Sequence, residues 1–452
     1  MEIRTMETVF EELMELLQNK QMKELKTRLD DMNEADAALF LQTLPEKDMA
    51  MVFRILAKEH AAEVFACMEI DEQQLIINSV TDRELANIIE ELYVDDAVDL
   101  MEELPANVVK RIMRNATPET RDLINQFLKY PENSAGSIMT AEFVDLEKDM
   151  TVKDAFDRIR KTGEDKETIY TCYVTSKDRK LLGVVTVRDM LLSPYEALIG
   201  DIMDENVISA RTTDDRETVA KMFNKYDFIA LPVVDLENRL VGIVTFDDAI
   251  DVLEEEATED IEKMAAITPS DKPYLKTGVL ETWRARVPWL LILMISATFT
   301  GLIIGFYESA LSKFVVLTAF IPMLMDTGGN GGSQTSVTII RSMSLGDLEF
   351  SDLVKVVWKE LRVALLCGLT LSAVNFLKLM YLDKVGILVS AVVCITLLAT
   401  VLLAKLVGGI MPMLAKKIGF APAVMASPFI TTTVDALSLI IYFRIATAIL
   451  KI

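Results

Sequence analysis

One carboxylate stands in the middle of a long apolar stretch near the C-terminal end of the chain. The stretch runs from Gly419 to Phe443 and reads GFAPAVMASPFITTTVDALSLIIYF, with Asp435 as its acid. A charged side chain at bilayer depth costs at least ~2.5–3.5 kcal/mol on insertion scales, so it usually faces a helix bundle or a watery path. Asp435 therefore predicts a cation pathway. A buried ion pair with Arg444 or Lys405, or a proton relay, is the alternative.

A second polar segment interrupts another apolar stretch. Between Val315 and Arg341 the chain reads MDTGGNGGSQ from Met325 to Gln334, which includes Asp326 and Asn330. Irregular backbone is tolerated at membrane depth where it lines a watery cavity, and small residues let helices approach closely. We therefore expect this span to be broken in its middle and to line the pathway. A helix-packing motif of small residues is the alternative.

These two segments offer the oxygen atoms that hard cations prefer. Thr431, Thr432 and Thr433 directly precede Asp435. Magnesium gives up its water reluctantly and is usually held by one or two carboxylates while it keeps several waters. A pore with one aspartate from each of two symmetry-related protomers fits this preference, whereas a calcium cage would need more protein oxygens. The residues alone do not rank Mg²⁺ against Co²⁺, Mn²⁺ or Ni²⁺.

The elements that position these residues are five apolar segments. Twenty residues cross ~30 Å of hydrocarbon, and an odd number of spans places the two termini on opposite sides. Most of the Lys and Arg residues then flank the inner ends, which predicts a multi-pass protein of the cell membrane with its N-terminal domains in the cytoplasm and its C-terminus outside. The predicted spans are Val287–Phe306, Val315–Arg341, Val363–Leu382, Val385–Ala404 and Phe420–Ile449.

Charge and composition exclude several classes of protein. The net charge is −23, and the part before Val287 carries −27 while the rest carries +4. A soluble part with this much negative charge is not expected to bind nucleic acid, because the phosphates of nucleic acids attract Lys and Arg. The chain has four scattered cysteines and a single histidine, His60, so it predicts neither a disulfide framework nor a zinc site. Met1 to Lys20 is charged throughout, unlike a signal peptide.

An enzyme is not expected either. No GxxxxGK[ST] loop for nucleotide hydrolysis occurs in the sequence. With His60 distant in sequence from the apolar spans, no Ser/His or Cys/His pair is offered for nucleophilic catalysis.

The acidic part has two kinds of pattern. Residues 1–130 show apolar positions at helical spacing, for example in Ala86–Leu104, with cap signals between them that predict short helices stacked as a superhelix. Residues 131–252 contain a repeat, in which LLGVVTVRDML from Leu181 is echoed by LVGIVTFDDAI from Leu240. Each copy predicts two strands and flanking helices.

The repeat resembles a tandem pair of cystathionine β-synthase (CBS) domains, at 131–198 and 199–252. In that family the Gly-h-h-Thr-x-x-Asp element, in which h is apolar, can hold the ribose of an adenosyl ligand. The matching residues here are Thr186 with Asp189, and Thr245 with Asp248. The resemblance implies binding of ATP or another adenine nucleotide. The alternative is that these residues only cap the helices that follow them.

A run of carboxylates joins the repeat to the first apolar span. Asp247 to Met264 reads DDAIDVLEEEATEDIEKM, with nine acids and a single lysine. Like charges four residues apart destabilise a helix by a few tenths of a kcal/mol per pair. A solvated helix face is one interpretation. Because the run lies beside the first span, relief of the repulsion by bound divalent cations is the other, and residues 253–283 are expected to form an acidic linking helix.

The order of these parts resembles the MgtE family of magnesium channels and transporters over essentially the whole chain. Two motifs are specific, PMLMDTGGNGGSQ at Pro322–Gln334 and TTTVDALSLIIYF at Thr431–Phe443. The resemblance implies a multidomain fold with an α-helical superhelix, an α/β CBS pair, an acidic connecting helix and a five-helix transmembrane domain at 284–452. It also implies a homodimer with a pore on the twofold axis.

The resemblance implies two sets of magnesium ligands. In the pore, Asp435 matches the family's carboxylate, with Asn330 and the Thr431 carbonyl as neighbours. The regulatory acids lie on the helical domain, the second CBS copy and the linking helix. They are Glu63, Asp95, Asp99, Asp215, Glu217, Asp227, Asp248, Asp251, Glu256, Glu259 and Asp260.

The sequence thus predicts a Mg²⁺ channel or transporter that imports Mg²⁺ and closes when cytosolic Mg²⁺ binds its acidic domains. One alternative is a membrane-anchored sensor whose CBS pair reads a nucleotide. The other is a CBS-regulated transporter of another solute, such as Co²⁺, Mn²⁺ or an organic cation.

Overall fold

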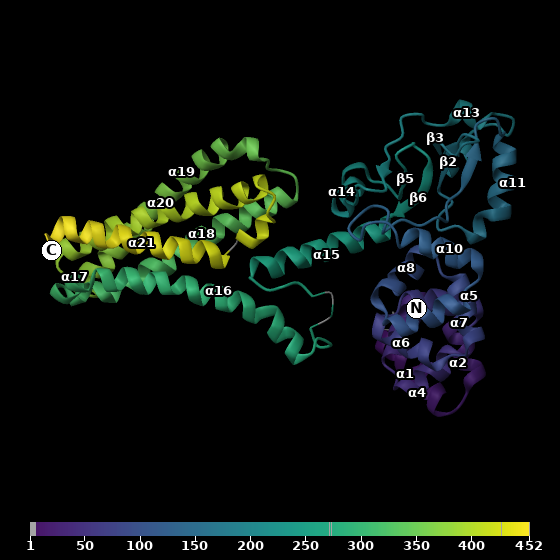
Figure 1. The fold of residues 1–452 in the computed structure, drawn as a ribbon, viewed down its shortest axis with the longest axis horizontal. Coiled ribbons are helices and arrows are strands. Elements are labelled where there is room, and N and C mark those ends of the chain that lie inside the picture. The colour runs from purple at the N-terminus through teal and green to yellow at the C-terminus, as the bar shows by residue number, and fades with distance from the viewer. Residues whose placement is uncertain (1–5, 271, 273, 426, 452) are drawn as a thin grey trace. The chain divides into compact units, whose positions relative to one another are not determined.

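The computed structural model describes residues 6–270, 272, 274–425 and 427–451. Within these residues the chain forms two compact units, Met1–Leu253 and Glu254–Ile452. Figure 1 shows both units and labels most of their helices and strands.

The N-terminal unit begins with a stack of short helices, as the cap signals predict. Thr81 caps α7 in a capping box with Glu84, and Thr117 caps α10. From α3 onward most helices pack on the one two places further along, as α3 does on α5 and α5 on α7, which is how stacked helical repeats share a core. The helices are α1 Met6–Gln18, α2 Met22–Asp30, α3 Glu34–Gln42, α4 Glu46–Phe53, α5 Lys58–Ala66, α6 Ile70–Ser79, α7 Asp82–Glu91, α8 Val94–Glu103, α9 Ala106–Asn115 and α10 Pro118–Phe127.

Two three-stranded sheets follow, one for each copy of the repeat. In both sheets the first strand is parallel to the second, and the second is antiparallel to the third. The strands are β1 Asp145–Glu147, β2 Thr171–Thr175, β3 Leu181–Thr186, β4 Ala210–Arg211, β5 Ala230–Val234 and β6 Leu240–Thr245. Their helices are α11 Val152–Thr162, η1 Gly163–Asp165, α12 Val187–Leu192, α13 Ile199–Ile202 and α14 Arg216–Tyr226.

The two copies are interlocked by backbone pairing. Thr140, which precedes the first sheet, pairs with Ile243 in β6, and Asp204 pairs with Val184 in β3. The repeated glycine makes this possible, because a Cβ at Gly242 would lie 2.7 Å from the Thr140 carbonyl oxygen. The Gly-h-h-Thr element therefore has a structural role in joining the copies.

The acidic run forms a single helix, α15, from Phe246 to Met264. It starts directly after β6. In the described residues of the predicted linking region 253–283, helix is present up to Met264 and again from Val279.

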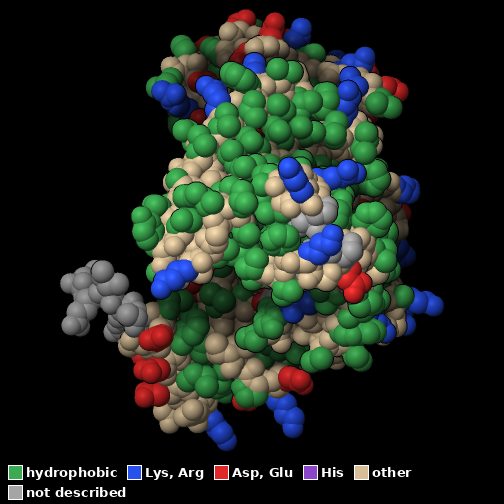
Figure 2. Space-filling view, turned by 90° about the vertical axis from the view of Figure 1, so that its left-hand side faces the viewer, with side chains coloured by type: hydrophobic (Ala, Val, Ile, Leu, Met, Phe, Trp, Pro, Cys, Tyr) green, Lys and Arg blue, Asp and Glu red, His purple; other side chains and the backbone are tan. Residues whose placement is uncertain are grey.

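The C-terminal unit consists mainly of long helices. They are α16 Val279–Phe306, α17 Glu308–Lys313, η2 Val315–Phe320, α18 Ile321–Ser344, η3 Phe350–Asp352, α19 Leu353–Tyr381, α20 Ile387–Lys417, η4 Pro422–Met425 and α21 Ser427–Leu450. Figure 2 looks at the end where α17 lies and shows hydrophobic side chains over most of the visible surface of this unit.

Four of the helices in the described residues are long and apolar enough to cross a membrane, namely Val279–Phe306, Phe350–Tyr381, Ile387–Lys417 and Pro422–Leu450. The apolar side chains of α16 face outward almost throughout. By contrast α18, which matches the predicted second span, is too polar to be among the four.

One expectation about α18 is wrong. The helix is continuous through MDTGGNGGSQ instead of being broken there. Its glycines serve close packing against α20 and α21: a Cβ at Gly332 would lie 2.6 Å from Ile430 Cγ2, and one at Gly328 would lie 2.7 Å from Thr400 Cγ2. Such contacts support the alternative of a helix-packing motif.

Candidate functional site

Asp435 lies on α21 where this helix packs against α18. Its side chain is half-buried, and its Oδ1 atom is buried without a hydrogen-bond partner among the described residues. Asp326 on α18 is near enough to interact with it electrostatically. An acceptor that is buried without a donor costs about 1–3 kcal/mol, so this carboxylate is suited to meet a cation that comes and goes.

The other two predicted pore residues lie on the same pair of helices. Thr431 is one turn before Asp435, and a Cβ at Gly329 would lie 2.8 Å from Thr431 Cγ2. Asn330, the next residue on α18, is exposed. The absence of a side chain at Gly329 thus lets the backbone of α18 approach Thr431.

The exposed side of α18 has a polar stripe. Asp326, Asn330, Gln334 and Thr338 follow one another at intervals of four residues, and all four are exposed. Residues four apart lie on one face of a helix. This face is chemically unlike the apolar outer faces of α16 and α19.

Lys405, one alternative partner for Asp435, contacts a different helix. It is buried on α20, and its Nζ donates to Thr335 Oγ1 at 3.3 Å. The Thr335 hydroxyl donates in turn to Glu360 Oε2 at 2.9 Å. The threonine thus links a buried ammonium to a carboxylate on α19, and the structure does not support the alternative of an ion pair between Lys405 and Asp435.

The C-terminal half of α21 is fixed by aromatic contacts. The hydroxyl of Tyr442 donates to the Leu317 carbonyl at 3.0 Å, and Phe443 stacks on Tyr307 at a centroid distance of 4.6 Å. These contacts hold α21 in register with the segment that leads into α18.

Seven carboxylates gather in the N-terminal unit, where α8 and the first CBS copy meet the start of α15. Each acts on others of the group electrostatically, and no basic side chain of the described residues is among the groups that shift their pKa values. We call this group the carboxylate cluster. Its members are Asp95, Asp96, Asp99, Glu142, Glu167, Asp247 and Asp248.

Burial, together with the neighbouring acids, raises the pKa values of five members, namely Asp95, Asp96, Asp99, Glu167 and Asp248. Burial, together with neighbouring acids, raises the pKa of Asp96 to about 6 and that of Asp99 to about 7. Burial and the charges of Asp247 and Asp248 raise the pKa of Glu167 to about 8. Carboxylates that raise one another's pKa without a basic neighbour form an arrangement that a divalent cation stabilises.

The structure brings together only some of the predicted regulatory acids. Asp95, Asp99 and Asp248 belong to the carboxylate cluster, and Asp251 acts electrostatically on Asp248. Glu63 lies instead near His60 on α5.

The remaining predicted acids have local roles in the structure. Asp215 caps α14, Glu217 pairs with Lys221 at 2.5 Å, and Asp227 ends α14 with a φ of 55°. Glu259 pairs with Lys263 on α15, which also bears Glu256 and Asp260.

The four residues predicted to hold an adenosyl ligand form helix caps. Thr186 and Asp189 make a capping box at the start of α12. Thr245 likewise donates to Asp248 at the start of α15. The capping alternative is therefore what the structure shows, and nucleotide binding stays a prediction.

Sequence reasoning missed four members of the carboxylate cluster. Asp96 and Asp247 could have been found, because each adjoins a predicted acid. Glu142 and Glu167 lie outside the predicted acidic segments and become neighbours of the other acids only through the fold.

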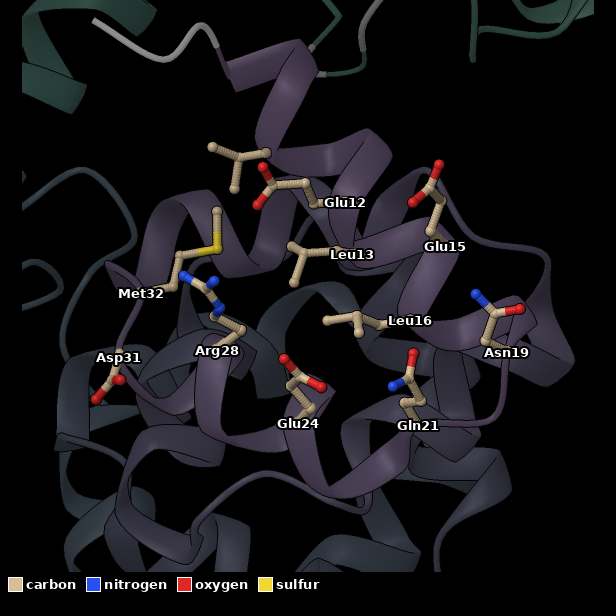
Figure 3. A pocket seen from close by; sticks show the side chains of 11 residues that line it. Glu12, Leu13, Glu15, Leu16, Asn19, Gln21, Glu24, Arg28, Asp31 and Met32 are labelled. Carbon is tan, nitrogen blue, oxygen red and sulfur yellow. The ribbon is translucent and has the colours of Figure 1, made fainter. Parts of the chain in front are cut away.

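A pocket of about 380 Å³ lies between α1 and α2. Figure 3 shows Leu13 and Leu16 on one wall and Arg28 and Met32 on the other. None of the predicted site residues lines it.

Models of known protein families match each main part of the chain. The model of the MgtE intracellular N domain matches residues 32–133, the CBS domain model matches 135–195 and 199–255, and the MgtE model, described as a divalent cation transporter, matches 321–445. A relative from Thermus thermophilus named magnesium transporter MgtE is 36% identical over 443 residues, which is 97% of this chain and 98% of the relative. The chain belongs to the MgtE family.

Two solved structures resemble the soluble part of this MgtE-family protein. The soluble part of a magnesium transporter is 34% identical, with a TM-score of 0.54, and the match covers 56% of this chain and all of that one. The cytosolic domain of the Mg²⁺ channel MgtE in complex with ATP is 35% identical, with a TM-score of 0.51 over 53% of this chain and 98% of that one.

These findings confirm the family resemblance, the CBS pair and the helical N-terminal domain. The relatives are named as transporters, so the expectation that the protein is not an enzyme is also confirmed.

Proposed function

We propose that this MgtE-family protein carries Mg²⁺ through the membrane along a path beside α18 and α21. The observation that supports the proposal most directly is the buried Oδ1 atom of Asp435, which has no hydrogen-bond partner among the described residues. Together with Thr431 and Asn330 it offers oxygen atoms of the kind Mg²⁺ prefers. The membrane potential would drive a divalent ion inward with about 4.6 kcal/mol per 100 mV.

We propose that a second copy of the chain completes the path. The polar stripe of α18 cannot face lipid without cost, because hydrocarbon offers no partners for its amide and carboxylate groups. A twofold axis beside this stripe would bring two copies of Asp435 to one pathway. Two carboxylates match the usual number that hold a partly hydrated Mg²⁺.

In this arrangement α18 is the fifth membrane span. Its 24 residues measure about 36 Å at 1.5 Å per residue, enough to cross ~30 Å of hydrocarbon. Five spans would place the C-terminus outside when the N-terminal domains are cytoplasmic, in line with the distribution of Lys and Arg.

We further propose that cytosolic Mg²⁺ closes the path by binding the carboxylate cluster. The helix that starts with Asp247 and Asp248 ends at Met264, which packs against Ile340 of α18 and Ala423. A bound cation would fix the start of α15, and through it the end that touches α18. Moving a gate from 1:99 to 99:1 requires about 5.5 kcal/mol of differential binding, which about four sites with a tenfold preference each would provide.

The CBS pair is proposed to bind an adenine nucleotide. The support is the solved relative in complex with ATP. Asp248 belongs both to the predicted ribose element and to the carboxylate cluster, so a nucleotide at this acid would alter Mg²⁺ binding as well.

The transport proposal is tested by Mg²⁺ uptake into proteoliposomes. Asp435→Asn keeps the shape of the side chain and removes its charge, and we expect uptake to fall by at least about tenfold, equivalent to ~1.4 kcal/mol. Asp383→Asn is the matched control, because Asp383 follows α19 and pairs with Lys378 at 3.2 Å. Equal uptake by wild type and Asp435→Asn would favour a membrane-anchored sensor, and faster uptake of Co²⁺ or Mn²⁺ than of Mg²⁺ would favour another cation.

A further inference from the structure

The single histidine of the chain lies beside two carboxylates in the helical domain. His60 and Glu63 are on α5, and Glu34 is the first residue of α3. One ligand atom from each of the three residues lies within 4.8 Å of the others. Because Glu34 comes from another helix, the spacing along the sequence does not reveal the group.

The backbone fixes which nitrogen of His60 carries a proton. Nε2 lies 3.0 Å from the Leu29 carbonyl oxygen, and a carbonyl can only accept a hydrogen bond. Nε2 is therefore the donor, and in a neutral imidazole Nδ1 is left with a lone pair. A metal-binding histidine usually has this arrangement, in which the far nitrogen donates to a backbone carbonyl and the near one faces the ion.

Nδ1 faces the Glu63 carboxylate. It lies 3.8 Å from Glu63 Oε2, and the imidazole is only 11% exposed. Three groups with lone pairs thus converge, and they repel one another unless a proton or a metal ion lies between them. An imidazolium would satisfy this geometry with a proton, and the experiment below separates the two possibilities.

A thiol lies close to the same group. Cys67 is one turn beyond Glu63 at the end of α5, and its thiol is free. Burial raises the pKa of this thiol, and the charges of Asp96, Glu34 and Glu63 raise it further, so these acids are its electrostatic neighbours. Cys67 can therefore report on a cation at the group.

We propose that Glu34, His60 and Glu63 bind one divalent transition-metal ion of the Zn²⁺ class. Mg²⁺ takes oxygen ligands, whereas imidazole with carboxylates suits Zn²⁺ and its neighbours in the first transition row. Tetrahedral Zn²⁺ would bring the ligand atoms to about 3.3 Å from one another. The side chain of Glu63 is 59% exposed and free to make this movement.

This site would differ in function from the proposed Mg²⁺ gate. It would use Glu63 as a ligand, although the family resemblance assigns this residue to Mg²⁺ sensing. It would also lie close to the carboxylate cluster, because Asp96 of that cluster is an electrostatic neighbour of Cys67. The N-terminal domain would thereby respond to a cation that the oxygen-only cluster does not select. The proposal needs no transport to be tested, so it stands or falls separately from the proposed function.

The test is calorimetric titration of the full-length protein in detergent with ZnCl₂, after EDTA treatment and with millimolar MgCl₂ present throughout. We expect one Zn²⁺ per chain to bind despite the Mg²⁺. His60→Ala and Glu34→Gln should each weaken binding by at least about 100-fold, the upper end of what a lost supporting contact costs at a metal site. Glu59→Gln removes an acid from the same helix and should leave binding unchanged.

Alkylation of Cys67, followed by mass spectrometry, provides a second readout. Zn²⁺ should slow the alkylation of Cys67 in the wild type and in Glu59→Gln, but not in Glu34→Gln. The Glu34→Gln variant provides the test if His60→Ala does not fold. No Zn²⁺ binding by the wild type, binding that both variants retain, or complete displacement by Mg²⁺ would each overturn the proposal.

Discussion

Asp248, in the first turn of α15, acts electrostatically on Asp95 of α8, and burial together with this charge raises the pKa of Asp95 well above its usual range. The two residues are far apart in the sequence of the N-terminal unit, and the fold places them in one group of acids whose pKa values are shifted by burial and by other acids. Such a contact is unfavourable unless a proton or a cation joins it. Protons and Mg²⁺ should therefore compete for the carboxylates of this cluster.

The first prediction concerns pH. An acid whose pKa is higher in the folded than in the unfolded state stabilises the fold below its unfolded pKa, and this contribution is lost as pH rises through the folded value. For Asp96, Asp99 and Glu167 the folded values are about 6, about 7 and about 8. Without divalent cations, the unfolding temperature of the N-terminal unit should fall from pH 5.5 to pH 8.5, as seen by scanning calorimetry.

Mg²⁺ should remove most of that fall, because it neutralises the same carboxylates at high pH. A thermal transition that is independent of pH, or one that Mg²⁺ shifts equally at both pH values, would contradict the idea that protons and Mg²⁺ share the carboxylate cluster.

A second prediction concerns gating. Asp95→Asn removes one of the mutually repelling charges, so the Mg²⁺-free N-terminal unit should become more stable while it loses a ligand. If one of about four sites with a tenfold preference is lost, the ratio of closed to open protein at saturating Mg²⁺ should fall about tenfold, equivalent to ~1.4 kcal/mol. Mg²⁺ uptake at graded Mg²⁺ concentration on the soluble-domain side measures this. Asp122→Asn, at an exposed acid of α10, is the control and should close like the wild type.

The sequence predicted the starts of helices better than it predicted α18. Cap residues such as Thr81 and Thr117 act locally, so their motifs indicated where α7 and α10 begin. Glycine disfavours an isolated helix, and for that reason the run around Asn330 was expected to break α18. The fold reverses this preference, because Gly328 and Gly332 allow α20 and α21 to approach closely.

The candidate sites show the same limit. Asp435 could be found because a charge in an apolar stretch is conspicuous in one dimension. Glu142, Glu167 and Glu34 could not, because each is an ordinary surface acid in sequence and gains its partners from other elements of the fold. Pairing between distant segments is not encoded in local composition.

A third prediction compares two neighbouring glycines of α18. At Gly332 a Cβ would lie 2.6 Å from Ile430 Cγ2 and 3.2 Å from the Ala404 carbonyl oxygen, whereas at Gly331 the nearest atom, Ala404 Cβ, is 4.0 Å away. Gly332→Ala should therefore destabilise the C-terminal unit by about 1–3 kcal/mol through overpacking, and Gly331→Ala should not. Thermal unfolding in detergent, followed by tryptophan fluorescence, distinguishes them, since all three tryptophans lie in this unit. Equal stability of the two variants would show that α18 has room to move.

The last prediction concerns the link between Lys405, Thr335 and Glu360. Thr335→Val keeps the shape of the side chain but removes the hydroxyl that accepts from Lys405 and donates to Glu360. The buried ammonium would then lose its hydrogen bond, which costs about 1–3 kcal/mol. Thr338→Val is the matched control, because Thr338 is exposed on the same helix and its hydroxyl bonds only the Gln334 carbonyl among the described residues.

Thermal unfolding of both variants should show a lower stability for Thr335→Val alone. In a Lys405→Met background the same substitution should cost less, because no ammonium remains to be satisfied, and the difference between the two backgrounds measures the coupling. Equal losses in both backgrounds would mean that Thr335 packs α18 against α20 without mediating between the two charges. A measured coupling would instead identify this triad as the contact that fixes the register of α18, and with it the position of Asn330 relative to Asp435.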